Sequence, residues 1–474
     1  MEKRIFDTIT QELKYDVLKE VAKLAYSDRL CDSYYAIPRI LIKDGVDAMH
    51  CCIYKDRAVV EEMVRFAVGI PNNPDAVIDV LDIACDECPI DKYTISDGCR
   101  NCISHKCIQA CPQEAITIGS NRKAVINQEK CIECGRCFRA CSYSAIREQI
   151  RPCVKSCKIN AIKVDQNRKA KIDHSKCISC GACMTKCPFG AIQDRSYILE
   201  AIKLLKEGES GAKKVYMIIA PAIVNQFRYA SVEQVVTGIK MLGVFNVVEA
   251  ALGADLIAFK ETEELLEKGK LLSSCCPSFV DYVKKNFTAL VPLISSTPSP
   301  MTAIGKKIKE QNEDIKIIFA GPCISKKVEF KQEGVSDIID CVITFEELQA
   351  LLDSRNIHCE TLEPSPLDNA SYFGRMFATS GGVTNAIKSV ATEIAPDFNF
   401  NPLVADGLDQ IKIALLKLNK NLIDNNFIEG MACGGGCISG AGCINHNDNN
   451  IKEVENYANT SLEKDVCSSI KHII

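Results

Sequence analysis

The chain has 474 residues and a formal net charge of −4, from 57 lysines and arginines against 61 aspartates and glutamates. This length permits two to four domains and a hydrophobic core that needs no disulfide cross-links. The balanced charge, the lack of tryptophan and an aromatic share of 6% argue against a nucleic-acid partner. The unusual feature of the composition is cysteine, with 28 residues.

Cysteine at this abundance indicates either disulfides in an oxidising compartment or metal thiolate sites in a reducing one. The N-terminus is charged and amphipathic, without the apolar segment of a secretion signal and without a twin arginine. The longest apolar run, near residues 215–224, is too short to span a bilayer. We therefore expect a cytoplasmic protein with reduced, metal-binding thiols and no membrane partner.

Three patterns follow one another along the chain. Residues 1–84 space their apolar side chains as a helix does, for example at Ile9, Leu13 and Val17, and predict a mainly helical region. Between residues 99 and 192 one phrase, Cys-x3-Cys followed by an Ala-Ile strand start, occurs four times. From 196 to 474, apolar runs alternate with segments of helical period, which predicts an α/β domain with mostly parallel strands. The runs expected as strands are 215–222, 245–252, 316–323 and 340–345.

The spacing Cys-x2-Cys-x2-Cys-x3-Cys occurs twice, at 131–141 and at 177–187. Three cysteines at this spacing surround one [4Fe-4S] cubane, and the fourth binds a neighbouring cluster. A zinc site would need two well-separated CxxC pairs, so the cubane is strongly favoured. A third copy at 99–111 carries two extra residues in its middle loop, and with the 131–141 run it predicts a ferredoxin-like domain at 85–147. The crossover rule gives one cluster Cys99, Cys102, Cys107 and Cys141, and the other Cys131, Cys134, Cys137 and Cys111.

The second module, predicted at 148–195, is irregular. Cys157 takes the crossover place beside Cys177, Cys180 and Cys183. Sixteen cysteines remain in this half once Cys31, Cys51 and Cys52 are set aside, enough for four sets of four. We therefore predict a fourth cubane, with ordinary buried thiols as the alternative. Its ligands would be Cys85, Cys88, Cys153 and Cys187.

Residues 96–195 hold 18 lysines and arginines but 8 aspartates and glutamates. Each cubane with four thiolates carries about −2, so buried clusters would cancel most of this surplus. Docking of an acidic electron carrier is the second interpretation.

The catalytic half resembles the [FeFe]-hydrogenases. SSCCPSF at 273–279, AGPCISKKVE at 320–329 and FIEGMACGGGCISGAG at 427–442 are similar to the family's three cluster motifs, in the same order. ATSGGV at 378–383 and IAPA at 219–222 add support. The resemblance covers residues 95 to about 445 and implies two lobes of mostly parallel sheet flanked by helices.

The resemblance also implies a cofactor, the H-cluster. This is a [4Fe-4S] cubane bridged by Cys437 to a diiron subcluster with CO, cyanide and an amine-bearing dithiolate. Lys326 would direct an ammonium group to a cyanide, and Met431, Pro221 and Ala222 would lie beside the cofactor. The three glycines before Cys437 would let the backbone approach it closely. The cubane's ligands would be Cys276, Cys323, Cys433 and Cys437.

The resemblance further implies a proton path. Cys275 matches the thiol beside the bridgehead amine, and Glu261, Ser295 and Glu264 match the relay that leads outward. Glu261 and Glu264 are three residues apart, so one helix face can carry both. A solvated acidic face would be the ordinary interpretation of the two glutamates taken alone.

Several residues depart from the family pattern. Gly321 stands in place of methionine, Ser273 of threonine, Phe279 of tryptophan, Ala222 of serine and Met301 of glutamine. Cys443 follows the third motif. The ligands are unaffected, so these changes point to a divergent subgroup with altered catalytic bias or oxygen sensitivity.

The expected function is thus reversible H2 formation from protons and electrons. There is no GxGxxG after a strand, which argues against direct use of NAD(P)H. The expected partners are ferredoxin or flavodoxin and the enzymes that make the diiron subcluster. The alternatives are a hydrogenase-like iron–sulfur scaffold, an H2 sensor and a pure electron-transfer subunit. The ferredoxin-like modules and Cys275 argue against the scaffold, intact relay residues against the sensor, and the second half of the chain against the subunit.

Overall fold

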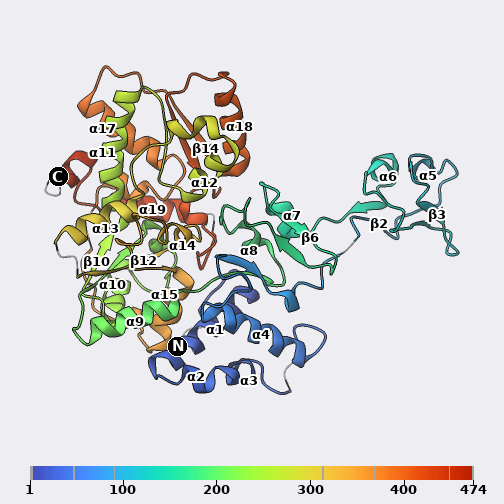
Figure 1. Ribbon diagram of the computed structural model, residues 1–474, viewed down its shortest axis with the longest axis horizontal. Coiled ribbons are helices and arrows are strands. Elements are labelled where there is room, and N and C mark those ends of the chain that lie inside the picture. Colours follow the sequence, from blue (N-terminus) through green and yellow to red (C-terminus); the bar gives the residue numbers. More distant parts are fainter. Residues whose placement is uncertain are drawn as a thin grey trace.

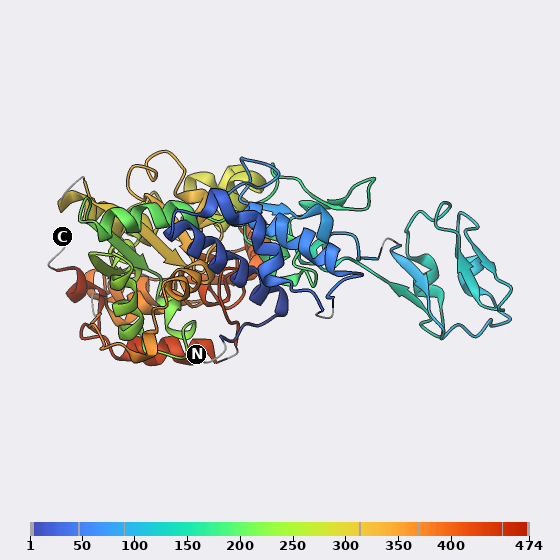
Figure 2. The same ribbon diagram turned by 90° about the horizontal axis from the view of Figure 1, so that it is seen from below.

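The computed structural model describes residues 4–45, 48–89, 91–311, 314–367, 370–447 and 449–471. Figure 1 shows a large body formed by the C-terminal half, a middle module beside it and a further module at the far end. In both views the far module projects away from the rest of the chain (Figures 1 and 2). Within the described residues, no helix combines the length and apolar character needed to cross a membrane.

The N-terminal region is mainly helical, as predicted from its periodicity. Helix α1 begins after Thr8, whose side chain accepts a hydrogen bond from the backbone N–H of Gln11. α1 packs against α4 of its own region and against α15 and α9 of the C-terminal half. The helices are α1 (Ile9–Tyr26), α2 (Leu30–Ser33), η1 (Tyr34–Ala36), α3 (Ile37–Leu41) and α4 (Ile53–Ala67).

One strand in this region was not predicted. β1 (Ile78–Val80) pairs antiparallel with β8 (Ile192–Asp194), and the 3-10 turn η2 (Asp82–Ala84) follows it. The three residues of β1 are too few for a period-2 pattern to be recognised, and their partner lies more than a hundred residues away. This pairing ties the N-terminal region to the middle module.

The two cluster-binding modules are built from short hairpins and one-turn helices. In the far module β2 (Tyr93–Ile95) pairs with β5 (Ile146–Glu148), and β3 (Ile116–Ile118) pairs with β4 (Ala124–Ile126). Its helices are α5 (Lys106–Gln109) and α6 (Arg136–Ala140). In the middle module β6 (Ile162–Val164) pairs with β7 (Ala170–Ile172), beside α7 (Pro152–Ser156) and α8 (Ala182–Lys186). The strands β3, β5, β6 and β8 fall on the four repeated Ala-Ile phrases.

The C-terminal half has two parallel sheets flanked by helices, which confirms the predicted fold class. One sheet has the order β10-β9-β12-β13, and its strands lie in the four predicted apolar runs. The other has the order β11-β15-β14. The strands are β9 (Val215–Ile219), β10 (Asn246–Glu249), β11 (Leu271–Leu272), β12 (Lys316–Gly321), β13 (Cys341–Thr344), β14 (Pro402–Asp406) and β15 (Phe427–Met431).

Helix α11 is the central helix of this half. It packs against α13, α16, α17 and α20, and thirteen of its nineteen residues are buried. The helices preceding the third cluster motif are α9 (Ile198–Glu209), η3 (Pro221–Asn225), α10 (Val232–Met241), α11 (Ala250–Lys268), α12 (Pro277–Asn286), η4 (Thr288–Leu293), α13 (Pro300–Gln311), α14 (Lys326–Glu329), α15 (Phe345–Ser354), η5 (Cys359–Thr361), α16 (Tyr372–Met376), α17 (Gly382–Ile394) and α18 (Gly407–Asn419). Within and after that motif come η6 (Cys437–Ser439), α19 (Asn450–Asn459) and α20 (Val466–Ile470).

Candidate active site

The far module contains two small cavities, each lined by four cysteines. One is lined by Cys99, Cys102, Cys107 and Cys141, and the other by Cys111, Cys131, Cys134 and Cys137. The structure therefore brings together the two sets that the crossover spacing predicted. A cavity with four sulfurs around it fits a [4Fe-4S] cubane, which thiolates hold from all sides.

The repeated Ala-Ile phrase has a structural role at these cavities. The backbone N–H of Ala115 donates to Cys111 Sγ at 3.3 Å, and that of Ala145 donates to Cys141 Sγ at 3.3 Å. Cys157 in the middle module accepts the same bond from Ala161 at 3.2 Å. Hydrogen bonds from backbone amides favour thiolate over thiol, and at Cys141 they outweigh burial and lower its pKa.

In the middle module Cys157, Cys177, Cys180 and Cys183 lie together. Burial, followed by the charges of the neighbouring thiols, raises the pKa of Cys183 well above its ordinary value. The pKa of Cys180 rises to about 11 for the same reasons. Four buried thiols that repel one another as thiolates need a cation, which a bound iron cluster supplies.

The structure also assembles the fourth set. Burial raises the pKa of Cys153 to about 11, and Cys187, Cys85 and Cys88 add to this rise as neighbouring charges. The buried guanidinium of Arg151 lies 3.9 Å from Cys85 Sγ. Although Cys85 and Cys88 precede the far module in sequence, they pack with the middle module, so the expected boundary at residue 85 does not separate the two in space.

The four thiols of the catalytic half meet where parallel strands end. Cys323 comes two residues after β12, Cys433 comes two after β15, and Cys276 is the N-cap of α12, shortly after β11. The carboxyl ends of parallel strands are the usual location of binding sites in such sheets. Burial and mutual repulsion raise the pKa of Cys323 to about 11 and that of Cys437 to about 12. These thiols also require a bound cation.

The glycines between Cys433 and Cys437 have a steric reason. Gly436 has φ +96°, a backbone conformation that favours glycine. A Cβ at this position would lie 2.6 Å from the carbonyl oxygen of Ala378 and 2.7 Å from the backbone nitrogen of Ser380. The loop can therefore approach the 378–383 segment only without a side chain.

A largely apolar cavity lies beside Cys437. Cys275, Cys323 and Lys326 bring its polar groups, and the predicted neighbours Met431 and Pro221 line it, whereas Ala222 is buried in η3 and does not. The Lys326 ammonium is buried and pairs with Glu329 at 2.5 Å. Thiolate, an ammonium donor and apolar walls are the donor set that an anionic diiron group with CO and cyanide would require, so the residues fit it. Further lining residues are Ala220, Ala250, Ala251, Ala254, Pro300, Met301, Phe319, Pro322, Gly374, Phe377 and Ala378.

A chain of hydroxyl and carboxyl groups leads away from Cys275. Glu261 Oε1 accepts from the Ser274 backbone N–H at 3.0 Å and from Ser274 Oγ at 3.1 Å. Thr297 Oγ1 lies 3.4 Å from the same oxygen and 2.9 Å from Ser295 Oγ. Ser295 Oγ donates to Glu264 Oε2 at 2.7 Å.

The two glutamates of this chain have opposite ionisation preferences. Burial raises the pKa of Glu261 to about 7, although the bonds from Ser274 oppose the rise. Burial also disfavours ionised Glu264, but its bonds with Lys268 and Ser295 outweigh this and lower its pKa. Glu261 Oε2 is buried and, among the described residues, has no hydrogen-bond partner. A proton can therefore reside on the inner carboxyl while the outer one stays charged.

Sequence reasoning missed two members of this chain, Ser274 and Thr297. The only signal for them is the density of hydroxyl residues at 273–274 and 295–299. All the predicted members, Cys275, Glu261, Ser295 and Glu264, lie along one route.

The structure explains two of the departures from the family pattern. A Cβ on Gly321 would lie 2.6 Å from the ring of Phe319, which lines the cavity, so this ring occupies the space of a side chain at 321. The ring of Phe279 packs on Gly430, where a Cβ would lie 2.3 Å away. Ser273 Oγ accepts from the Gly430 backbone N–H at 3.1 Å and so retains the hydroxyl's role.

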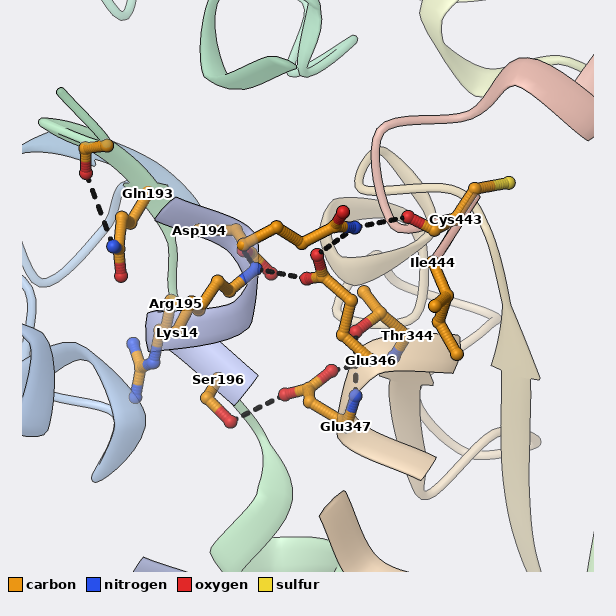
Figure 3. Close-up of polar contacts among 12 residues, drawn as sticks. Lys14, Gln193, Asp194, Arg195, Ser196, Thr344, Glu346, Glu347, Cys443 and Ile444 are labelled. Carbon is orange, nitrogen blue, oxygen red and sulfur yellow. Dashed lines mark hydrogen bonds and ion pairs between the residues drawn. The ribbon is translucent and has the colours of Figure 1, made fainter. Parts of the chain in front are cut away.

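A buried ionic network joins the three parts of the chain next to this site. Lys14 of α1 pairs with Asp194 of β8 at 2.6 Å and with Glu346 of α15 at 2.5 Å (Figure 3). Lys327, adjacent to the cavity residue Lys326, pairs with Asp194 and Glu347 at 2.7 Å each. The network fixes the middle module against the catalytic half.

The fold and the cysteine sets define an iron–sulfur protein with ferredoxin-like modules ahead of an α/β domain. Residues 213–441 match the family model "Iron only hydrogenase large subunit, C-terminal domain". Residues 98–145 match a 4Fe-4S dicluster domain, and residues 170–193 match a 4Fe-4S binding domain. The chain belongs to the iron-only hydrogenase family.

Its relatives include both enzymes and assembly proteins. Iron hydrogenase 1 of Clostridium pasteurianum is 29% identical over 275 residues, which is 47% of each chain. The cytosolic iron-sulfur assembly component 3 of Rattus norvegicus is 24% identical over 275 residues, 45% of this chain and 57% of the relative. The alignments therefore span about half of each relative's length.

Among solved structures, a variant of [FeFe]-hydrogenase HydA1 from Chlamydomonas reinhardtii superposes with a TM-score of 0.50 and 20% identity. The superposition covers 59% of this chain and 93% of that one. This likeness concerns the fold.

Proposed function

We propose that this chain is an [FeFe]-hydrogenase that interconverts protons, electrons and H2. The observation that carries the proposal is the cavity beside Cys437, where a thiol (Cys275), an ammonium (Lys326) and apolar walls face one space. A protein that only stored or transferred a cubane would have no use for a proton-donating thiol in this place.

The cofactor would be the H-cluster. Cys276, Cys323, Cys433 and Cys437 would hold its cubane, and the cavity would receive its diiron part. When bound, the diiron group supplies the metal centre at which protons are reduced or H2 is cleaved. Lys326 orients that group by donating hydrogen bonds, and Met431, Pro221 and Phe319 exclude water from it.

The chain's own residues move the proton. Burial keeps the Cys275 thiol protonated by raising its pKa well above the ordinary value, which suits a group that delivers protons to the cavity. Glu261, whose pKa is about 7, restores that proton at neutral pH. Thr297 and Ser295 connect Glu261 with Glu264, whose low pKa favours exchange with solvent.

Electrons would pass through the cubanes. The far module would receive them from ferredoxin or flavodoxin in a reducing compartment, and the middle module would deliver them to the catalytic half. Five sets of four cysteines would then hold five cubanes. The diiron group would come from maturation enzymes, because no residue of the chain provides its ligands CO and cyanide.

The second candidate function is that of an iron–sulfur assembly factor, because several relatives carry that name. The chain of contacts from Ser274 to Glu264 favours the enzyme, since cluster assembly requires no proton path.

The test is anaerobic expression with and without the maturation enzymes. With them, we expect infrared bands of CO and cyanide together with H2 evolution from a reduced dye. Without them, the cubane absorbance should persist while both signals are lost, and adding a synthetic diiron complex should restore them. Matured protein that shows neither the bands nor H2 would support the assembly factor instead.

A further inference from the structure

Two serines occupy equivalent places after two of the catalytic cysteines. Ser278 comes two residues after Cys276, and Ser325 comes two residues after Cys323. Both side chains are buried, with 3% of each residue exposed, and their hydroxyls are hydrogen-bonded to each other. The two ligand loops are thus joined side chain to side chain.

Both hydroxyls also contact the middle module. Ser278 Oγ and Ser325 Oγ each lie 3.1 Å from the carbonyl oxygen of Ile178. Ser325 Oγ lies 2.9 Å from the carbonyl oxygen of Ser179. Ile178 and Ser179 are the two residues between Cys177 and Cys180 in the middle module. Two loops of one cluster site therefore bind the loop of the next cluster site through the same pair of hydroxyls.

The backbone between these contacts reaches a sulfur directly. The N–H of Ser179 donates to Cys177 Sγ at 3.4 Å, while its carbonyl accepts from Ser325. Ser179 adopts φ +53°, a strained conformation for a residue with a side chain, which the bonds on both sides hold in place.

The surfaces around the contact leave no room for movement. Gly181, with φ +79°, packs so closely that a Cβ would lie 2.4 Å from the Cβ of Ala441. Lys285 of α12 donates to the carbonyl oxygen of Cys177 at 2.6 Å. The thiols of the two sites are also near enough to raise one another's pKa, since Cys276 acts on Cys180 and Cys180 acts on Cys433.

We propose that Ser278 and Ser325, with the carbonyls of Ile178 and Ser179, form a serine clamp that positions the middle-module cubane for electron exchange with the catalytic site. Ser278 and Ser325 are positioning residues, since their hydroxyls touch backbone and not the reacting atoms. This inference rests on the proposed function for its catalytic consequence, but not for its geometry.

The reason that hydroxyls serve here is the direction of their bonds. Alanine at both positions would leave the two carbonyls buried without their donors, and buried carbonyls without a donor are strongly disfavoured. The 177–181 loop would then open more often. Because electron exchange depends on the separation of the two clusters, each opening interrupts it.

The experiment compares the double variant S278A/S325A with wild type and with S278T/S325T, which keeps both hydroxyls. Ser461→Ala is the matched control, because Ser461 is also buried and also contacts two backbone carbonyls, at 2.8 and 2.9 Å, far from the cysteine sets. Three quantities are measured: amide hydrogen exchange of 177–181, magnetic coupling between the two neighbouring cubanes, and the ratio of dye-linked H2 oxidation to H2/D2O exchange. The exchange reaction needs only the catalytic site, whereas dye reduction also needs the cubanes.

In S278A/S325A we expect faster amide exchange, weaker coupling and a ratio lowered by about tenfold, the effect of losing buried hydrogen bonds. S278T/S325T and Ser461→Ala should keep wild-type values. An unchanged ratio and coupling in the double variant, or equal losses in Ser461→Ala, would overturn the clamp. If S278A/S325A does not fold, S278A and S325A are measured singly with the same criteria. A wild type without H2/D2O exchange would refute the proposed function instead, and coupling and amide exchange would then decide the clamp alone.

Discussion

Thr297 and Ser295 hold their side-chain oxygens 2.9 Å apart, and this contact connects the inner glutamate of the site with the outer one. Thr297 reaches Glu261 and Ser295 reaches Glu264. The glutamates are three residues apart on α11, yet the hydroxyls that join them come from the loop before α13.

Thr297→Val should interrupt this route. Valine has nearly the same shape but no hydroxyl, so proton transfer between the glutamates loses its intermediate and H2 evolution should fall by about ten- to a hundredfold. The infrared pattern of the cofactor should stay unchanged. Thr297→Ser is the control, because it keeps the hydroxyl and should keep most of the rate. Equal activity of the valine and serine variants would remove Thr297 from the route.

Cys275→Ser should abolish turnover without removing iron. A thiol has an ordinary pKa near 8.5, while a serine hydroxyl is far too weak an acid to replace it, so the rate should fall by several orders of magnitude. The CO and cyanide bands should remain, since Cys276 is the ligand. Cys275→Asp restores a titratable group and should recover part of the rate. Loss of the cluster in Cys275→Ser would make Cys275 a ligand.

The pH dependence of stability should carry opposite signatures of the two glutamates. With a pKa raised to about 7, folded Glu261 keeps a proton that the unfolded chain loses near its ordinary value of 4.5. It therefore lowers the free energy of unfolding as pH rises through this window, by about 2–3 kcal/mol. Glu261→Gln should remove that decline. Thermal unfolding from pH 4.5 to 8 measures the difference between the two proteins.

Glu264→Gln is the comparison for this measurement. The pKa of Glu264 is lowered, so its stabilising contribution is present above its ordinary value and is lost as pH falls. Its variant should differ from wild type mainly at neutral pH, and less so in acid. Parallel curves for wild type and Glu261→Gln would contradict the buried protonated carboxyl.

Replacing Cys85 and Cys88 with alanine should remove one cubane only. Cys153 and Cys187 cannot hold a four-iron cluster as a pair, so anaerobically reconstituted protein should lose about four of its roughly twenty cubane irons. Iron analysis and EPR check this result. The pair Cys51 and Cys52 is the control, because both side chains are exposed and belong to none of the five sets. A wild type with iron for only three accessory and catalytic sites would refute the fourth set.

Lys327→Met should destabilise the junction of the three parts. It leaves Asp194 and Glu347 buried, with one cation removed from the network, at a cost of about 3–5 kcal/mol. The thermal midpoint of the cluster-loaded protein should drop clearly. Lys331→Met, at an exposed position one helical turn further on, should change it little. Similar midpoints for both variants would show that the network contributes no net stability.

The sequence by itself determined the cysteine sets of the far module, the parallel strands of the catalytic half and the order of the three cluster motifs. Each of these is written in local spacing: Cys-x2-Cys surrounds a cluster within one loop, and an apolar run predicts a buried strand wherever it packs. The positions of Glu261 and Glu264 on one face of a helix are local in the same sense.

Only the tertiary structure decided which distant segments meet. Thr297 comes to Glu261, Lys14 to Asp194, and Ser325 to the loop between Cys177 and Cys180 through the packing of separate elements. Such contacts join residues from 36 to more than 140 positions apart, and no periodicity in the sequence encodes them. A hydroxyl or a lysine has the same local pattern on a solvated surface as in a buried network. Its role is fixed by the burial and the partners that folding provides.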